Sequence, residues 1–418
     1  MPNRVGQVIT QRAQNGNVIT FDYDAALGRL EKQRVTTLGS GTDGTVKSMK
    51  YTFDNLGRRK AVTSYSDDAC VTALNEVAFE YTDLGALAAE FQEHTGTAHN
   101  GTLAVRYAYD VPAKAMRLTD ITYPNGRKSY RDYGAAGSLS DKISRLAAIK
   151  DNNGDVLASY AFNGTGTMVV EDFVQPNVKL DRFGGTPGTY AGFDRFGRVS
   201  QQVWRDYGAG ADCEKFTYEY DENSNRKNRQ NTVAAATGKK LDELYAYDSL
   251  DRLVDFKLGK LNPGKTDIPT TNGDRLRREE WTLTDTGNWQ AYKVDATGDG
   301  SYAGAGDLNQ TRAYTANKLV DIMSAPGQAF WTYPMYDVRG NMIILPRPYD
   351  VASTYNCTYD AWNRLTKVDN NIFTVAEYRY DGLGRRIRKF EPDGQNWTVT
   401  EYYYQQTGRC WKPAAMMV

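Results

Sequence analysis

Two groups of residues in this chain could do chemistry: a pair of histidines and an aspartate-rich loop. The histidines, His94 and His99, lie five residues apart in the polar segment EHTGTAHN. This spacing in a Gly- and Thr-rich stretch is not that of a helical metal-binding pair. The sequence also contains no GxSxG phrase, so no nucleophile elbow is predicted. We interpret both histidines as exposed loop residues and expect no catalytic residue and no enzyme activity.

The aspartate-rich loop runs from Asp295 to Asp307 and reads DATGDGSYAGAGD. Asp295, Thr297 and Asp299 alternate, which is faintly similar to a loop that surrounds calcium with oxygen ligands. An EF-hand carries a bidentate Glu at its twelfth position, and this loop has Gly306 there, with Asp307 one place later. We favour a solvated Asp/Gly turn and keep Asp295, Asp299 and Asp307 as weaker calcium candidates.

Composition and spacing exclude several other classes. The 51 basic residues balance 51 acidic ones, so no positive field attracts a nucleic-acid backbone. The glycines that follow Asp295 precede no GK[ST] phrase, so we expect no nucleotide and no other cofactor. The apolar runs are too short to span a bilayer, and the N-terminus lacks the apolar core of a secretory signal. The widely separated cysteines form no CxxC pair and suggest neither a zinc site nor a disulfide framework; they are Cys70, Cys213, Cys357 and Cys410.

The dominant feature of the sequence is a phrase that recurs along it: an aromatic residue, Asp, two or three residues, Gly or Asn, then Arg. Repeats of this kind set the architecture of a chain. The copies comprise Tyr23, Asp24, Gly28 and Arg29; Phe53, Asp54, Gly57 and Arg58; Phe193, Asp194, Gly197 and Arg198; Tyr220 and Asp221; Tyr247, Asp248 and Arg252; Tyr336, Asp337 and Gly340; Tyr359, Asp360, Asn363 and Arg364; and Tyr380, Asp381, Gly384 and Arg385.

Each copy predicts a β-hairpin. In EYRYDGLGRRIRKF, Tyr378 and Tyr380 lie two apart and so project from the same face of a strand. Asp381 opens a type I turn by accepting a hydrogen bond from the backbone two residues on. Gly384 supplies a left-handed residue and the bulge, and Arg385 begins the return strand. The aromatic residues are expected to pack neighbouring units together, since cross-strand aromatic pairs stabilise sheets.

The non-glycine residues at the left-handed position fit this prediction. Asn363 and Asp251 occupy it in two copies, and Asn and Asp tolerate positive φ better than other side chains. The Tyr220 copy is one residue longer and has Asn225 before its Arg. The Tyr81 copy lacks the Arg, and the Tyr109 copy (YDVPAK) lacks the Gly.

The phrase is not continuous along the chain. It fades from Tyr133 to Phe193 and from Asp255 to Ala329, where a Thr286–Trp289 remnant (TGNW) persists. One unit alone is too small to bury its own face, so stability must come from neighbouring units. We predict an all-β repeat array of antiparallel β-hairpins that forms a curved or spiralling sheet over residues 1–390. Residues 391–418 are expected to form a terminal strand and tail, the truncated start of a core-associated region.

These residues resemble the Rhs/YD-repeat family of bacterial polymorphic toxins, insecticidal toxin complexes and teneurins. The resemblance extends from Tyr23 to Arg386. It implies a sheet of hairpins that spirals into a hollow shell, which in the family commonly encloses a C-terminal toxin. The family's DPxGL-type self-cleavage motif is missing, and the chain stops soon after Trp411. We therefore expect a segment made of repeats alone, without self-cleavage or effector activity.

The leading functional hypothesis is a non-enzymatic shell segment that encloses or presents a toxin or a separate polypeptide. The alternative is a cell-surface adhesion or carbohydrate-binding module whose exposed aromatic residues stack on glycans. A remnant of a self-cleaving core is the weakest reading. The resemblance implies a secreted or cell-surface protein that is cytoplasmic before export. A piece of shell would also expose a sheet edge and its lumenal face, which predicts self-association. The Arg385–Lys389 strand is expected to be a solvated face or a guarded edge.

Overall fold

The computed structural model describes residues 4–110, 116–183, 192–411 and 416–417. The chain divides into two compact units, which we describe separately. The first contains Met1–Ser129 and Thr332–Val418, and the second contains Tyr130–Trp331. Both consist almost entirely of antiparallel β-hairpins, which confirms the predicted fold class.

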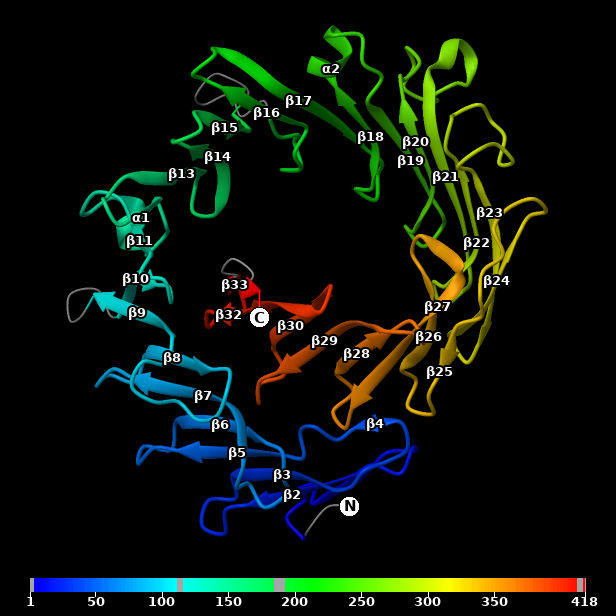
Figure 1. The fold of residues 1–418 in the computed structure, drawn as a ribbon. Coiled ribbons are helices and arrows are strands. Elements are labelled where there is room, and N and C mark those ends of the chain that lie inside the picture. The colour runs from blue at the N-terminus through cyan, green and yellow to red at the C-terminus, as the bar shows by residue number, and fades with distance from the viewer. Residues whose placement is uncertain (1–3, 111–115, 184–191, 412–415, 418) are drawn as a thin grey trace. The chain divides into compact units, whose positions relative to one another are not determined.

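The N-terminal strands of the first unit pair antiparallel in chain order, apart from the short β4 (Figure 1). They are β1 (Thr10–Arg12), β2 (Val18–Tyr23), β3 (Leu30–Thr37), β4 (Thr42–Asp43), β5 (Ser48–Phe53), β6 (Arg59–Tyr65), β7 (Ala73–Tyr81), β8 (Leu87–Glu93), β9 (Ala104–Asp110) and β10 (Arg117–Thr122).

The C-terminal hairpins of the first unit form a second antiparallel sheet. Its strands are β25 (Met335–Tyr336), β26 (Met342–Arg347), β27 (Asp350–Asp360), β28 (Leu365–Asp369), β29 (Thr374–Tyr380), β30 (Arg386–Asp393), β31 (Asn396–Glu401) and β34 (Met416–Met417), and β32 (Tyr403–Tyr404) pairs separately with β33 (Cys410–Trp411). Strand β4 pairs parallel with β27, so the two ends of the chain meet within this unit.

The second unit continues the same pattern, beginning with β11, which crosses the unit boundary. Its strands are β11 (Lys128–Asp132), β12 (Ala148–Lys150), β13 (Val156–Asn163), β14 (Thr167–Phe173), β15 (Val178–Asp181), β16 (Gln201–Asp206), β17 (Ala211–Tyr220), β18 (Arg226–Asn231), β19 (Asp242–Tyr247), β20 (Leu253–Gly259), β21 (Arg275–Leu283), β22 (Trp289–Asp295), β23 (Leu308–Thr315) and β24 (Lys318–Ser324). The helices α1 (Leu139–Lys142) and α2 (Thr232–Ala236) and the 3₁₀ turn η1 (Thr271–Gly273) lie in links between strands.

Alternation of side chains explains why these segments form strands. In β7, Asn75, Val77, Phe79 and Tyr81 occupy alternate positions and therefore share one face. Phe79 and Tyr81 pack beside a buried cluster that contains Val105. The shared face also carries the buried polar side chain of Asn75. The core is therefore a thin layer of apolar side chains interrupted by polar ones.

A register shift precedes most of the repeat turns, at the aromatic residue that leads the phrase. Examples are the shifts between Thr52 and Phe53, between Thr358 and Tyr359, and between Ala246 and Tyr247. The extra residue on one strand is a β-bulge, which increases the local twist. Each repeat therefore adds a twisted hairpin to the sheet.

The hairpins continue where the sequence phrase fades. Asp151–Asp155 and Thr284–Asn288 both close with the two backbone bonds of the regular turns, and Gly154 and Gly287 both have φ of +86°. In the second turn, Thr284 Oγ1 takes the place of the aspartate and accepts from Asn288 N at 3.0 Å. A threonine hydroxyl can thus replace the aspartate carboxylate. The hairpin therefore persists at a turn where the sequence no longer shows the repeat phrase. The position at which the Tyr109 copy lacks Gly lies outside the described ranges.

Candidate functional site

The repeat turns are built around the aspartate of the phrase. Asp381 Oδ1 accepts from the backbone N of Leu383 and of Arg385, both at 2.9 Å. Its other oxygen, Oδ2, accepts from Arg385 Nε at 2.7 Å. The same three contacts hold the turns of the copies that begin at Phe53, Phe193, Tyr247 and Tyr359. The aspartate therefore satisfies backbone donors and fixes the arginine at once.

The fourth turn residue has the left-handed conformation that the sequence suggests. The angle φ is +80° at Gly57 and +83° at Gly384, and it is +62° at Asn363 and +59° at Asp251. The expectation that the Tyr220 copy is one residue longer is wrong, because Asn225 takes the arginine's place beside Asp221 and Ser224, with φ of +74°, holds the left-handed position. Asn341 does the same beside Asp337 in the Tyr336 copy. The arginine position thus requires a hydrogen-bond donor more than a charge.

The arginine of one repeat reaches the next repeat, a role that sequence reasoning missed. Arg58 NH1 donates to Thr82 O at 3.5 Å, and the guanidinium lies 4.5 Å from the centre of the Tyr81 ring. Arg364 likewise donates to Asp381 O at 3.0 Å and lies over Tyr380. A cation over an aromatic face contributes about 0.5–1 kcal/mol at exposed sites and more when water is excluded. The arginine therefore joins neighbouring hairpins.

The leading tyrosine makes the reciprocal contact with the repeat before it. The hydroxyl of Tyr380 donates to Leu365 O at 2.7 Å, and that of Tyr220 donates to Val199 O at 2.7 Å. Equivalent bonds are made by Tyr23, Tyr81, Tyr109, Tyr247, Tyr314, Tyr359 and Tyr404. We call this bond the tyrosine latch. In copies that carry both residues, the tyrosine bonds to the preceding repeat and the arginine to the next one, so the hairpin is joined to both neighbours.

In the first unit, the turns of the last hairpins pack against the first strands. The turn of the Tyr359 copy buries Ala361 with Ile19 and Val35. Beside it, the indole Nε1 of Trp362 donates to Gln33 Oε1 at 3.0 Å. These contacts join residues more than 300 positions apart in the sequence. The turn therefore has a tertiary role in addition to reversing the chain.

The next turn lies against β6 and β7. A Cβ on Gly382 would come 2.3 Å from Val62 Cγ1, so the absence of a side chain allows this close approach. Next to it, Asn75 Nδ2 donates to Tyr380 O at 3.0 Å. Glycine at this turn position is thus required by packing against Val62, whereas the left-handed residue of the same turn is Gly384.

A third turn, Gln405–Arg409, follows Tyr404 and meets β8 and β9. The contact with β8 is made by a side-chain amide. Gln92 Nε2 donates to Tyr404 O at 2.7 Å, and Tyr404 N donates back to Gln92 Oε1 at 2.8 Å. Gln406 N then donates to the Tyr107 hydroxyl at 2.6 Å. Burial raises the pKa of Tyr107. We call the contact between the three C-terminal turns and strands β2–β9 the polar seam.

A buried charged group lies at the centre of the polar seam. Arg385 pairs with Asp381 at 2.7 Å and with Glu90 at 2.6 Å, and all three side chains are less than a fifth exposed. Burial raises the pKa of Glu90, and the charge of Arg385 partly offsets that effect. Removing one member of such a group leaves an uncompensated charge, which is strongly destabilising.

A second charged group surrounds His94. Its Nδ1 lies 3.5 Å from Glu401 Oε1, and its ring stacks on Tyr403 with centroids 4.5 Å apart. The neighbouring His94 ring, followed by the hydrogen bond from Arg388, lowers the pKa of Glu401 to about 2. The expectation of an exposed His94 is therefore wrong, because strands from both ends of the chain cover it. The solvated strand face expected at Arg385–Lys389 is also wrong, since Arg385 and Arg388 both bind across the polar seam.

A cavity of about 200 Å³ opens within the polar seam. Its lining includes Asn75, His94, Arg364, Tyr378 and Phe390. Asn75 Oδ1 and His94 Nε2 are buried and make no hydrogen bond within the described part of the chain. That same part contains no cluster of three His, Cys, Asp or Glu side chains able to hold a metal ion. The cavity is large enough for several water molecules.

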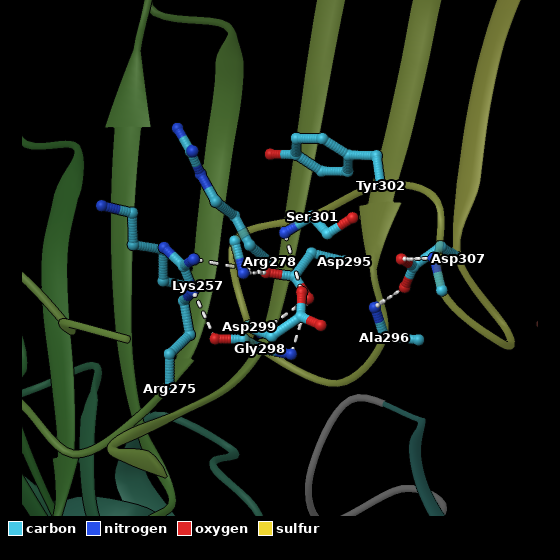
Figure 2. A network of polar contacts seen from close by, with 12 residues as sticks. Lys257, Arg275, Arg278, Asp295, Ala296, Gly298, Asp299, Ser301, Tyr302 and Asp307 are labelled. Atoms are coloured by element: carbon cyan, nitrogen blue, oxygen red, sulfur yellow. Dashed lines mark hydrogen bonds and ion pairs between the residues drawn. The ribbon is translucent and has the colours of Figure 1, made fainter. Parts of the chain in front are cut away.

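The aspartate-rich loop forms a separate polar network in the second unit (Figure 2). Asp295 is fully buried and accepts from the backbone N of Gly298, Asp299 and Gly300 at 2.6, 3.1 and 2.9 Å. Its Oδ2 also pairs with Arg275 NH2 at 3.3 Å. Asp295 is therefore not part of a solvated turn. The carboxylate is saturated with donors from its own loop and from β21.

The other two calcium candidates also bind backbone groups. Asp307 accepts from Ala296 N at 2.8 Å and from Gly304 N at 2.6 Å, and Asp299 accepts from Ser301 N at 2.7 Å. Each carboxylate thus closes its own small turn (Figure 2). A cation would have to displace amide donors at all three positions.

The remaining sequence candidates lie apart from the polar seam. His99 is exposed and lies 3.3 Å from Glu93. No disulfide joins the cysteines, all four of which lie in the described ranges, and burial raises the pKa of Cys357 to about 11, which suppresses the reactive thiolate. In the described ranges, no helix has both the length and the apolar character needed to cross a membrane.

Comparisons with known proteins identify similar structures but no similar sequence family. No family model matches the sequence, and no curated protein matches it. A Photorhabdus luminescens Tc holotoxin pore with a mutation in TccC3 superposes on 96% of the chain with a TM-score of 0.60 and 14% identity. A crystal structure of TcdB2-TccC3-Cdc42 superposes on 99% with a TM-score of 0.59 and 14% identity, and TcdB2-TccC3 on 96% with 0.58 and 14%.

These similarities show the fold. The chain spans about a fifth of the length of the solved chains that it matches, since 20% or 21% of each is covered. Its hairpin array is thus of the kind that occurs in Tc toxin proteins.

Proposed function

We propose that the chain is a wall segment of an Rhs/YD-repeat shell that encloses or presents a toxin or another polypeptide. It acts sterically and without catalysis, as part of a secreted bacterial protein. The polar seam is the observation that carries this proposal. Turns from the last hairpins of the first unit bind strands from its first hairpins. Contacts such as those of Gln92 with Tyr404 and of Arg385 with Glu90 join these two parts of the chain. The similarity of fold to Tc toxin proteins supports it.

The repeat contacts favour a wall over a glycan-binding surface. The latch tyrosines donate their hydroxyls to backbone carbonyls, and arginines cover several of their rings. A sugar that stacks on such a ring would compete with the guanidinium already there. Loss of glycan-array binding when exposed Tyr or Trp residues are replaced by Ala would instead favour the adhesion alternative.

The test uses the polypeptide encoded together with this chain. The two are co-expressed, purified by size exclusion and treated with trypsin under native conditions. A wall segment predicts co-elution and slow digestion of the partner, and faster digestion with Arg385→Ala, which opens the polar seam. Arg198→Ala is the matched control, because Arg198 holds the equivalent turn position outside the polar seam. A partner that is digested equally fast with and without this chain would rule out enclosure.

A further inference from the structure

In three turns that do not pack on other strands, the residue before the left-handed glycine is an exposed leucine. These residues are Leu27, Leu56 and Leu84 of the first unit, which are 68%, 74% and 62% exposed. Successive turns are two strands apart, so these side chains recur about every 10 Å along the sheet. They therefore form one row, which we call the turn row.

The last hairpins show what such a row can bind. At the equivalent position they carry Trp362 and Leu383, and neither is exposed. Trp362 packs beside the Ile19–Val35 cluster at the ends of β2 and β3 that lie farthest from their own turn. Within this chain, one such turn side chain, Trp362, is therefore received by the turn-distant ends of β2 and β3.

The C-terminal sheet has turn-distant ends of its own, and they are exposed and apolar. Tyr349, in the link from β26 to β27, is fully exposed, and Ile372 and Phe373, in the link from β28 to β29, are 86% and 61% exposed. Arg347 NH2 donates to Asn370 O at 3.4 Å and so holds the two links next to each other. We call Tyr349, Ile372 and Phe373 the link row.

We propose that the turn row of one molecule docks on the link row of a second copy of this chain. The contact extends an interface that the chain already makes internally, the polar seam, and both rows have the two-strand repeat of the sheet. The chain has no net charge at pH 7, so long-range repulsion does not oppose the contact. Because the two rows are different surfaces, the association is head-to-tail and continues beyond two molecules, into rings or open chains.

Lysine substitutions on one row at a time test this directly. The turn-row variant is Leu27→Lys, Leu56→Lys and Leu84→Lys. The link-row variant is Tyr349→Lys, Ile372→Lys and Phe373→Lys. The control variant, Val5→Lys, Val71→Lys and Leu139→Lys, adds the same charge at exposed apolar residues outside both rows. Circular dichroism checks that each variant keeps its strand content.

Sedimentation velocity then distinguishes the outcomes. We expect the unmodified chain and the control to grow beyond dimers as concentration rises. Each one-row variant alone should remain monomeric. A 1:1 mixture of the two one-row variants should stop at a heterodimer, because one intact row remains on each molecule. A wild-type chain that stays monomeric at all concentrations, one-row variants that associate like the control, or a mixture without heterodimer would each overturn the proposal.

Discussion

At the residue scale, the side chains of the phrase stabilise both their own turn and the neighbouring repeats. The aspartate holds its own turn and the arginine, while the arginine and tyrosine reach the adjacent repeats. The same Asp–Arg pair is used in two environments. In the Phe53 copy both side chains are between a fifth and a third exposed, whereas in the Tyr359 copy the aspartate is almost fully buried. Environment, not sequence, decides which copies have a tertiary role.

Glu401 should make the stability of the chain depend on acid. Its folded pKa is about 2, against an ordinary value of 4.5. A carboxyl with a depressed pKa contributes stability that is fully present above pH 4.5 and is lost as pH falls toward 2. We expect the urea midpoint to fall over this range and Glu401→Gln to flatten that part of the profile. Equal acid dependence in both proteins would contradict this account.

Asp295 should be a structural carboxylate. Asp295→Asn leaves Arg275 buried without its charge partner, which should cost about 3–5 kcal/mol of unfolding free energy. Asp299→Asn, at an exposed position of the same loop, should change it by no more than about 0.5 kcal/mol.

The calcium hypothesis makes the opposite prediction for the same loop. If the three aspartates bound calcium, EDTA would lower the melting temperature, because a ligand stabilises the state that binds it. We expect EDTA to leave it unchanged. A drop that added calcium reverses would overturn the structural role.

At the element scale, the sequence was enough to predict the hairpins but not the distant strands on which their turns pack. Alternating aromatics, a turn aspartate and a left-handed Gly or Asn are local signals, and they gave the all-β array. At the Thr284 turn the sequence shows only the TGNW remnant of the phrase, because a threonine hydroxyl replaces the aspartate carboxylate. The polar seam was missed because Glu90 and Gln92 look like ordinary polar strand residues and His94 like a loop residue, and only tertiary contacts bury them.

The tyrosine latch should contribute measurably to each inter-repeat contact. Tyr380→Phe removes the hydroxyl that binds Leu365 O and should lower the unfolding free energy by about 1 kcal/mol. Tyr378→Phe is the control on the same strand: its ring lies beside Arg386, and its hydroxyl makes no hydrogen bond among the described residues. Equal effects of the two substitutions in urea titrations would show that the latch adds nothing.

At the scale of the whole molecule, the account depends on the ends of the chain meeting within the first unit. The polar seam joins β2–β9 to the last three turns, through two charged groups and a side-chain amide that pairs like backbone. The repeats alone would give an open array. The seam makes the first and last hairpins one compact unit, as a wall segment requires.

An engineered disulfide between Val62 and Gly382 tests this claim most directly. The Val62 Cβ lies 3.3 Å from where a Cβ would stand on Gly382, close to the 3.5–4.5 Å usual for disulfides. We predict that Val62→Cys with Gly382→Cys, in a chain whose exposed Cys213 and Cys410 are changed to Ser, forms a crosslink on mild oxidation. Mass spectrometry should identify it, and Val62→Cys with Gly394→Cys, a pair within the same unit, should give none. A folded Val62–Gly382 double variant that stays reduced would contradict the polar seam.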